Sequence, residues 1–537
     1  MKNPNTSTFL LLFLISLGSH AASAADEHQD FVECLSQKFN NYSSISSNLY
    51  TPSNSSYSSI LRFSIQSLRF ISDSTPKPAA IVQPEHESQI PPVIHCAKAS
   101  GLQIRTRSGG HDYEGQSYVA HVPFVILDLI KLNEITVDAS EKTAWVGSGA
   151  TNGALYYAVA QKSPVLGFPA GVSITLGMGG HVSGGGYGML LRKYGLAADQ
   201  VIDARIVNVN STILDRKSMG EHLFWAIRGG GGASFGVITA WKVQLVDVPE
   251  KVTVFNIGKT LEQNATQLIH KWQSIAPEFV DDLFLRIIIK PETVRSETQV
   301  TNRTIRAIFN AQFLGKIDTL LPLMQKIFPE LRLVKEDCTE LSWIESVLFF
   351  LDFPIAAREK LLNRLQPKVR FFKAKSDYVQ KPIPGFGLEG VWRLMLEAVA
   401  NQSVIIFSPY GGRMAEIPAS ATPFPHRTGN LYMIQHIIFW DESQSQDSES
   451  YISWMGRLYT YFAPFVSSSP RQTYFNYRDL DIGANNPNGE TSYEQAGIWG
   501  KKYFSDNFDR LVRVKTMVDP HNFFKDEQSI PPVALKI

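Results

Sequence analysis

The chain has 537 residues and a mass of 60.0 kDa, which is enough for two or three packed lobes. Its composition is that of an ordinary globular protein, with 44% hydrophobic residues, 19% charged residues and a formal net charge of +1. That balance, without any run of basic residues, excludes the electrostatic footprint of a nucleic-acid-binding protein.

The N-terminus predicts export from the cytoplasm. Lys2 precedes the apolar run Phe9–Leu17, and Ala22-Ser-Ala24 is a small-residue cleavage pattern. We interpret residues 1–24 as a signal peptide, which is too short for a stable membrane span. We expect a monomer without a membrane partner that enters the secretory pathway and ends in the extracellular space, the cell wall or the vacuole.

Export also bears on the cysteines and the glycosylation sequons. In an oxidising compartment one disulfide is expected among the three cysteines, and a Cys34–Cys96 bond would join the N-terminal segment to the main body, leaving Cys338 free. No His/Cys cluster suggests a metal. Glycosylation in surface loops is expected at six Asn-x-Ser/Thr sequons: Asn41, Asn54, Asn210, Asn264, Asn302 and Asn401.

Strand and helix patterns alternate along the first half of the chain. After a helical segment at 27–50 come a short strand at 77–84, a helix at 86–100, buried strands at 102–106 and 124–129, a strand at 143–147 and a helix at 152–161. This alternation predicts a mixed α+β or α/β lobe that ends near residue 250.

The pattern changes between residues 250 and 470. Alternating apolar segments predict long strands at 283–289 and 431–440, with amphipathic helices at 317–328 and 389–400. We interpret this part as an antiparallel sheet with helices, a second lobe. The tail returns to a helix at 492–517.

Three glycine-dense stretches lie between residues 105 and 236, at Arg105–Gly115, Gly167–Gly188 and Arg228–Gly236. Glycine lets backbone N–H groups come close to a ligand, as they do around a pyrophosphate. One such stretch would be explained by tight turns in a glycine-tolerant fold. Three of them favour a large phosphate-bearing cofactor.

The spacing of these glycines does not match the common nucleotide motifs. None of the three stretches fits G-x-G-x-x-G, and the single match at Gly385–Gly390 follows a proline-rich loop, so we interpret it as chance. No P-loop motif occurs. The hydrolase motif G-x-S-x-G nearly forms around Ser173 but fails at Thr175.

Four motifs carry a family resemblance: Ser-Gly-Gly-His-Asp-Tyr-Glu-Gly, Gly-Phe-Pro-Ala-Gly-Val-x-x-Thr-Leu-Gly-x-Gly-Gly-His-x-Ser-Gly-Gly-Gly-Tyr-Gly, Arg-Gly-Gly-Gly-Gly-Ala-Ser-Phe-Gly and Asn-Tyr-Arg-Asp-Leu-Asp. In this order they resemble the berberine bridge enzyme-like family of plant FAD-linked oxidoreductases, and the resemblance spans essentially the whole chain. It implies an α+β fold of the vanillyl-alcohol oxidase (PCMH) type. The implied parts are an FAD-binding domain at 25–250 with its core at about 75–249, an α/β substrate domain with an antiparallel sheet at 251–473, and a C-terminal segment at 474–537 that returns to the FAD lobe.

The resemblance implies that His111 is bonded to the 8α-methyl carbon of FAD. Ser173 stands where most relatives have a cysteine bonded to flavin C6, and it lacks the nucleophilicity of a thiolate, so His111 is expected to be the single linkage. His181 resembles the histidine that lies near flavin N1. Further cofactor-binding positions implied by the resemblance are Thr106, Arg107, Ser108, Gly109, Gly110, Asp112, Val172, Gly177, Met178, Gly179, Gly180, Tyr187, Ala233, Ile238 and Asn476.

Leu176 occupies the position where, in this family, a valine lets oxygen reach the flavin. By this resemblance a leucine predicts slow use of O2 and a different electron acceptor. A repacking of the nearby Met178 would open a path for oxygen, so oxidase and dehydrogenase both stay open.

For substrate chemistry, Tyr477 resembles the tyrosine that removes a hydroxyl proton while a hydride passes to flavin N5. The accompanying family positions are Tyr113, Tyr187 and Gln435. Met433 stands where alcohol-oxidising relatives carry lysine and alkaloid- or cannabinoid-forming relatives carry glutamate, and Ile288 replaces a histidine of some cannabinoid synthases. These departures favour an apolar pocket and do not identify a substrate.

Our leading hypothesis is a secreted FAD-linked oxidoreductase that acts on a small plant metabolite with a phenolic, alkaloid or allylic alcohol site. One alternative is the oxidation of monolignol-like alcohols or carbohydrates by an oxidase or dehydrogenase. The other is a non-redox cyclase that contains flavin.

Overall fold

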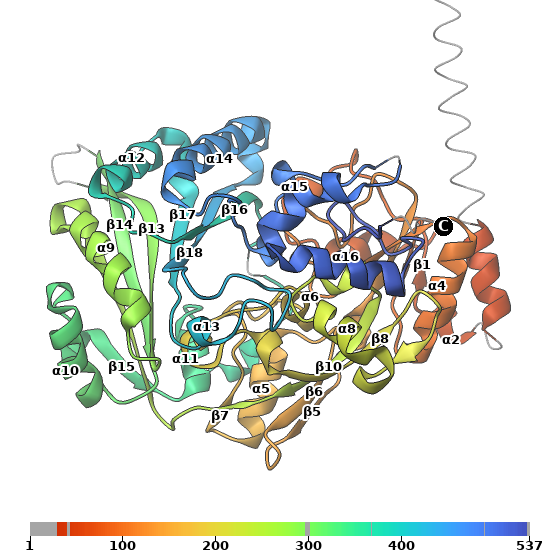
Figure 1. Ribbon diagram of the computed structural model, residues 1–537, viewed down its shortest axis with the longest axis horizontal. Helices are drawn as coiled ribbons and strands as arrows, with labels where there is room; N and C mark the ends of the chain where they lie inside the picture. The colour runs from red at the N-terminus through yellow and green to blue at the C-terminus, as the bar shows by residue number, and fades with distance from the viewer. Residues whose placement is uncertain (1–28, 40–42, 296–300, 367, 488, 534–537) are drawn as a thin grey trace, which may run out of the picture.

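The computed structural model describes residues 29–39, 43–295, 301–366, 368–487 and 489–533. The predicted signal peptide and the sequon at Asn41 lie outside the described residues. Figure 1 shows two lobes side by side, one built from the first half of the chain together with the tail, and one built around a large sheet.

The N-terminal lobe begins with a four-stranded sheet of order β1-β2-β4-β3. Its strands are β1 (Leu49–Tyr50), β2 (Ala80–Val82), β4 (Phe124–Asp128) and β3 (Gln103–Arg107). β2 and β3 both pair with β4 in parallel, and helix α4 (Ile90–Ala99) connects β2 to β3. All five residues of β4 are buried, as a parallel strand covered on both faces requires.

A five-stranded antiparallel sheet follows, of order β5-β6-β10-β8-β9. Its strands are β5 (Ile135–Asp138), β6 (Thr143–Gly147), β10 (Val237–Gln244), β8 (Val201–Val207) and β9 (Ile213–Leu214). Helix α5 (Asn152–Lys162) starts at Thr151, whose hydroxyl accepts a hydrogen bond from the Ala154 N–H at 3.3 Å and caps the helix. Helices α6 (Met178–Ser183) and α8 (Arg216–Ile227) complete this part.

The second lobe is organised around a seven-stranded antiparallel sheet of order β15-β12-β14-β13-β17-β18-β16. Its strands are β15 (Cys338–Leu341), β12 (Val252–Thr260), β14 (Thr301–Phe313), β13 (Leu283–Arg295), β17 (Ser403–Pro409), β18 (Tyr432–Trp440) and β16 (Phe371–Val379). The predicted α+β fold, with a mixed N-terminal lobe and an antiparallel second sheet, is confirmed.

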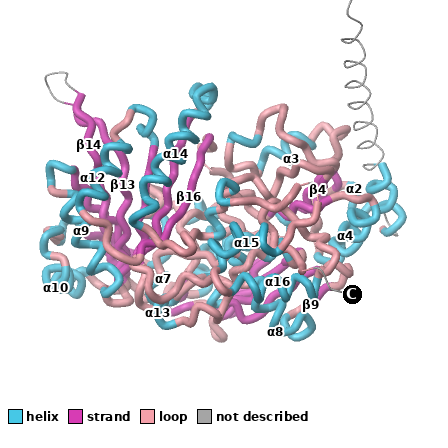
Figure 2. Tube along the Cα trace, turned by 45° about the horizontal axis from the view of Figure 1, so that its top comes forward, coloured by secondary structure: helices cyan, strands magenta, loops and turns pink. Residues whose placement is uncertain are grey.

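The two faces of the large sheet have different neighbours because successive side chains of a strand point to opposite sides. On β13, Leu283, Leu285 and Ile287 belong to a core shared with helices α9 (Ala265–Ile275), α10 (Ile317–Ile327), α12 (Gly385–Met395) and α14 (Ser448–Phe462). Figure 2 shows α9, α10 and α12 on the outer side of β13 and β14. Phe284 and Arg286 alternate with the core residues and so face the N-terminal lobe.

The tail crosses back to the N-terminal lobe. Helix α16 (Asn507–Val518) lies beside α8 in Figure 1, and α15 (Tyr493–Phe504) packs against α16. Trp499 and Phe508 share a core with Phe224 and Trp225. The prediction of one helix at 492–517 was wrong. Ser505 has a φ of +46°, which an α-helix does not tolerate, so the chain turns between two helices.

Two other predicted boundaries were also wrong. Within the described residues, the segment expected as one helix at 27–50 has a helix over 29–38, then α2 (Ser43–Ser46) and the strand β1. The helix expected at 389–400 is α12, which starts at Gly385 and ends at Met395. Its glycines disfavour a helix by propensity, but Gly387 and Gly390 pack directly against Phe465 and Tyr461, so tertiary contacts override the propensity.

The predicted Cys34–Cys96 disulfide is present and joins the helix at 29–38 to α4, while Cys338 is free. The side chains of Asn54, Asn210, Asn264 and Asn401 are exposed. Asn302 lies in β14, and its side chain is outside the described residues.

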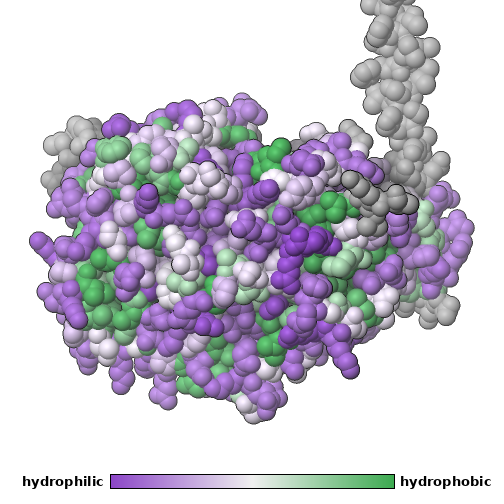
Figure 3. Space-filling model, viewed as in Figure 1, coloured by the Kyte–Doolittle hydropathy of each residue, from purple (hydrophilic) through white to green (hydrophobic). Residues whose placement is uncertain are grey.

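The surface view in Figure 3 is mostly hydrophilic with small hydrophobic areas. Within the described ranges no helix is long and apolar enough to cross a membrane. The same part of the chain holds no group of three or more His, Cys, Asp or Glu side chains that could bind a metal ion.

Candidate active site

A cavity of about 660 Å³ lies between the N-terminal lobe and the large sheet. All three glycine-dense stretches line it, together with β13, β17, β18 and the Tyr474–Arg478 segment of the tail. Every residue predicted to bind the cofactor, gate oxygen or act on the substrate lines this cavity, except Arg107 and Met178.

Arg107 and Met178 support the cavity wall from behind. The Arg107 guanidinium is buried in an ion pair with Asp128 at 2.8 Å and donates to the Leu61 carbonyl at 2.8 Å. Met178 is fully buried in the core of the N-terminal lobe. Met433, where the family resemblance led us to expect a lysine or glutamate, is also buried, in an apolar cluster beside Tyr187 and Tyr477.

The turn that carries His111 is fixed by close backbone packing. β3 ends at Arg107, and Gly110 has a φ of +68° and touches the Ser64 carbonyl, so no larger residue fits there. Gly109 packs directly against the backbone of Gly177. Two of the three glycine-dense stretches therefore lie back to back under the cavity.

His111 is held through one of its ring nitrogens. Its Nε2 lies 3.0 Å from the Thr175 hydroxyl oxygen, and the Ser173 hydroxyl is 3.5 Å from that same oxygen. Burial lowers the pKa of His111 to about 4, so the ring is neutral near neutral pH. Because Thr175 occupies Nε2, the nitrogen left for other chemistry is Nδ1.

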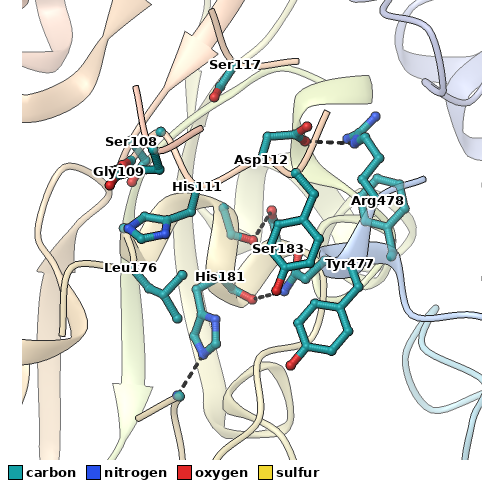
Figure 4. A pocket seen from close by; sticks show the side chains of 18 of the residues that line it. Ser108, Gly109, His111, Asp112, Ser117, Leu176, His181, Ser183, Tyr477 and Arg478 are labelled. Atoms are coloured by element: carbon teal, nitrogen blue, oxygen red, sulfur yellow. Dashed lines mark hydrogen bonds and ion pairs between the residues drawn. The ribbon is translucent and has the colours of Figure 1, made fainter. Parts of the chain in front are cut away.

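His181 lies close to His111 and Leu176, as Figure 4 shows. The Gly171 N–H donates to His181 Nε2 at 2.9 Å, so the neutral ring carries its proton on Nδ1. Burial, with a smaller effect of His111, lowers the pKa of His181 to about 4. The Asn476 side chain donates to the His181 carbonyl at 2.9 Å, which ties the tail to α6.

Tyrosine side chains form the opposite end of the site. The hydroxyl oxygens of Tyr187 and Tyr477 are 2.5 Å apart. The ring of Tyr477 is stacked on that of Tyr113, with centroids 5.2 Å apart and an interplanar angle of 5°. Gln435 donates to the Tyr113 hydroxyl at 2.6 Å. The four residues predicted for substrate chemistry are thus one connected group.

Arg286 is a site residue that the sequence analysis did not find. It lines the cavity from β13, and its Nε donates to the Asn310 side-chain oxygen at 2.6 Å. Burial lowers the pKa of Arg286, and the nearby hydroxyls of Tyr187 and Tyr477 oppose that shift. The sequence did hold one indication of its role, because Arg286 is the single charged residue in the apolar run Leu283–Ile289.

The electrostatics of the two coupled tyrosines differ. Burial raises the pKa of Tyr187 above its usual value, and hydrogen bonds from Tyr477 and Ser408 and the charge of Arg286 offset only part of that rise. Burial raises the pKa of Tyr477 well above its usual value, and the contact with Tyr187 raises it further. If one of the two hydroxyl groups loses its proton, these contacts favour the phenolate form of Tyr187 over that of Tyr477.

The cavity also has the features needed to hold a large cofactor. A Cβ added at Gly180 would meet no atom within 4 Å, so this glycine leaves open space in the cavity wall. Ser117 Oγ, on another part of the wall, is buried and has no hydrogen-bond partner among the described residues. Open glycine backbone and unpartnered polar atoms along one cavity fit the phosphates and polar ring atoms of FAD.

Comparison with known families agrees with this fit. The profile of the FAD binding domain family matches residues 78–216, and the profile described as berberine and berberine like matches residues 473–531. The second match contains Asn476, Tyr477 and Arg478, the part of the tail that lines the cavity.

Whole-chain relatives extend the comparison. The chain is 50% identical to tetrahydroberberine oxidase of Berberis wilsoniae over 537 residues, covering 99% of both chains. It is 47% identical to monolignol oxidoreductase AtBBE-like 13 of Arabidopsis thaliana over 533 residues, covering 98% of both. The solved structure of BBE-like 28 from Arabidopsis thaliana is 46% identical and superposes with a TM-score of 0.87, covering 94% of this chain and 100% of that one.

The solved structures also include a grass pollen allergen, Phl p 4, described as having glucose dehydrogenase activity. It is 43% identical, with a TM-score of 0.86 over 94% of this chain and 100% of that chain. A variant of Phl p 4 with isoleucine exchanged for valine is described as a glucose oxidase. The fold and the cavity thus define an FAD-dependent oxidoreductase. The chain belongs to the berberine bridge enzyme-like family.

Proposed function

We propose that this protein oxidises a small plant metabolite through a hydroxyl or phenol group that binds at the Tyr187–Tyr477 pair. The observation that carries the proposal is the 2.5 Å contact between the two hydroxyls, beside Arg286, in the same cavity as His111. The pair is placed to take up a proton from a bound hydroxyl group.

FAD would supply the redox chemistry by accepting a hydride from the substrate carbon. His111 would hold it covalently through Nδ1, the nitrogen that Thr175 does not occupy. The Ser173 hydroxyl lies beside Thr175 and is a poor nucleophile, which supports a single linkage. His181 would present its Nδ1–H as a donor to the bound cofactor.

The proton step belongs to the tyrosine pair. From sequence, Tyr477 alone was the predicted base. The contacts favour Tyr187 as the member that carries the negative charge, because Tyr477, Ser408 and Arg286 all stabilise its phenolate. We infer that Tyr477 faces the substrate and passes the proton on to Tyr187, with Gln435 and Tyr113 orienting the hydroxyl group.

The charges near the pair favour alcohols and phenols over protonated amines. Arg286 is a cation, and Met433 offers no carboxylate. The two aspartates that line the cavity, Asp112 and Asp526, are both paired with Arg478. The relatives are named for different substrates, tetrahydroberberine and monolignols among them, so their names do not choose a substrate class for this chain and the charge pattern carries the argument.

We further propose Leu176 as the gate that slows oxygen. In Phl p 4 an isoleucine-to-valine exchange accompanies the description as an oxidase, so one aliphatic side chain can decide the acceptor in this family. Leu176 lines the cavity next to Gly171 and His181, where its bulk would keep O2 away from a bound flavin.

Export through residues 1–24 and glycosylation at the exposed sequons also stay proposals. The same holds for the division of the chain near residues 250 and 473. The family matches at 78–216 and 473–531 support that division, and the disulfide supports an oxidising compartment.

The test is anaerobic mixing of purified protein with a panel of alcohols, phenols and amines while the flavin absorbance is followed. We expect alcohols or phenols to bleach the flavin and amines not to. Bleaching by amines alone would contradict the charge argument, and bleaching by no compound would favour a non-redox cyclase. Mass spectrometry of flavin peptides should find an adduct at His111, and an adduct at Ser173 would contradict the single linkage.

A further inference from the structure

A buried ionic network lies directly behind the stacked rings of Tyr113 and Tyr477. The residue before Tyr113 is tied to the residue after Tyr477, since Asp112 Oδ2 lies 2.8 Å from Arg478 Nε. This first tie joins the turn that carries His111 to the tail.

A second tie joins the same two segments through the edge of the large sheet. Lys373 on β16 forms an ion pair with Glu114, the residue after Tyr113. Its Nζ also lies 3.0 Å from Asp479 Oδ1, two residues after Tyr477. The stacked tyrosines are therefore held on both sides, once directly and once through Lys373.

The second tie is shielded from water. The side chains of Lys373, Glu114 and Asp479 are 2%, 5% and 1% exposed. Burial alone lowers the pKa of Lys373, but the surrounding carboxylates outweigh it and raise that pKa. Charges in such an environment interact far more strongly than at the surface. Without Lys373, Glu114 would keep only Arg69 and Asp479 would keep only Lys375 as ion-pair partners among the described residues, and the link between Glu114 and Asp479 would be lost.

The sheet edge also touches the stack itself. Phe372, the neighbour of Lys373 on β16, packs edge-on against Tyr113 with ring centroids 5.2 Å apart. Three segments far apart in sequence thus meet at one lysine.

We propose that Lys373 is a positioning residue, which sets the spacing and angle of Tyr113 against Tyr477 and thereby the geometry of the proton-accepting pair. The inference rests on the proposed function. A misplacement of about 1 Å in such a group costs on the order of 100-fold in rate, so the effect is measurable.

Lys375 is a matched control on the same strand. It is 4% exposed, and its Nζ lies 2.6 Å from both Asp479 and Asp481. Among the described residues no ion pair joins Lys375 to Glu114. It is equally buried and equally charged, but it does not connect the His111 turn to the tail.

The experiment compares Lys373→Met with Lys375→Met in the flavin-loaded protein. After Lys373→Met, Glu114 keeps, within the part of the chain that the structure describes, only its 3.3 Å ion pair with Arg69. The double variant Lys373→Met/Glu114→Gln removes this under-compensated buried charge without restoring the tie to Asp479. Lys373→Arg keeps the charge. Thermal unfolding of each variant shows how much of any effect is general destabilisation.

Two readouts are taken. The rate of flavin reduction at saturating alcohol or phenol should fall roughly 10- to 100-fold in Lys373→Met and in the double variant, less than threefold in Lys375→Met, and recover in Lys373→Arg. The visible absorbance spectrum of the bound flavin, which needs no substrate, should shift in the Lys373 variants and not in Lys375→Met.

Equal reduction rates and equal flavin spectra in Lys373→Met and Lys375→Met would overturn the proposal. So would a loss of rate that is proportional to the loss of thermal stability in both variants. A panel in which no compound reduces the flavin contradicts the proposed function instead. In that case the absorbance spectra of the bound flavin alone test whether Lys373 is a positioning residue.

Discussion

Replacing Arg286 by methionine tests the charge that stabilises the tyrosine pair. The guanidinium is buried in the cavity, lowers the pKa of Tyr187 and is held by Asn310 at 2.6 Å. Methionine keeps much of the side-chain bulk and removes the charge. Tyr477, Ser408 and Arg286 lower the pKa of Tyr187, and only Arg286 among these three carries a formal positive charge. Its loss leaves the two neutral hydroxyl groups.

An opposite charge beside a buried group shifts its pKa by about 1 to 3 units, and each unit corresponds to about 1.4 kcal/mol and a tenfold change in the ionised fraction. The cation favours the phenolate, so its removal raises the pKa of the pair. The base is active when deprotonated, so activity is present above that pKa and lost below it. At pH 7 the rate should therefore fall roughly 10- to 1000-fold.

The assay is the anaerobic rate of flavin reduction measured by stopped flow across pH. The rising limb should move to higher pH by about 1 to 3 units in Arg286→Met. Because the pKa of Tyr187 already lies above its usual value, this shift appears up to about pH 10 as a rate roughly 10- to 1000-fold lower with the same slope against pH. Arg286→Lys, which keeps the charge, should leave the limb near its original position. A rate that falls as far in Arg286→Lys as in Arg286→Met would refute the electrostatic role and leave only a packing role.

Three other changes give sharp expectations. Leu176→Val should speed reoxidation of the reduced protein by air, and an unchanged rate would remove Leu176 as the gate. Gly180→Ala should leave the fold intact, because the new methyl group meets no atom within 4 Å, but should lower the flavin-to-protein absorbance ratio; an unchanged ratio would place the cofactor elsewhere. Removing the disulfide with Cys34→Ala and Cys96→Ala, which are 62 residues apart, should cost about 2 to 4 kcal/mol in urea unfolding, and no loss would show that the N-terminal helix adds little stability.

The sequence was informative wherever a local pattern carries the physics. Glycine density marked the cavity wall because close backbone packing, as at Gly109 against Gly177, excludes every other residue. Alternation predicted β13 and β18 because each has one face on a hydrophobic core. The cysteines left few choices, and Cys34–Cys96 was found from them.

Features that depend on register or on distant contacts could not be predicted in this way. The direction of Arg286 follows from which face of β13 meets the helices, and the network around Lys373 joins residues more than 250 positions apart, such as Glu114 at a separation of 259. Helix ends were misplaced at Ser505, where a left-handed residue breaks a continuous amphipathic pattern.

The return of the tail to the N-terminal lobe has a consequence for biosynthesis. Asn476 and Tyr477 leave the ribosome after the first half of the chain and the large sheet have been made, and their segment packs with α15 and α16 against residues such as Trp225. A chain that stops before residue 476 therefore lacks the contact between the Tyr187 and Tyr477 hydroxyls and the bond from Asn476 to His181. Assembly of this part of the cavity wall is therefore coupled to synthesis of the tail.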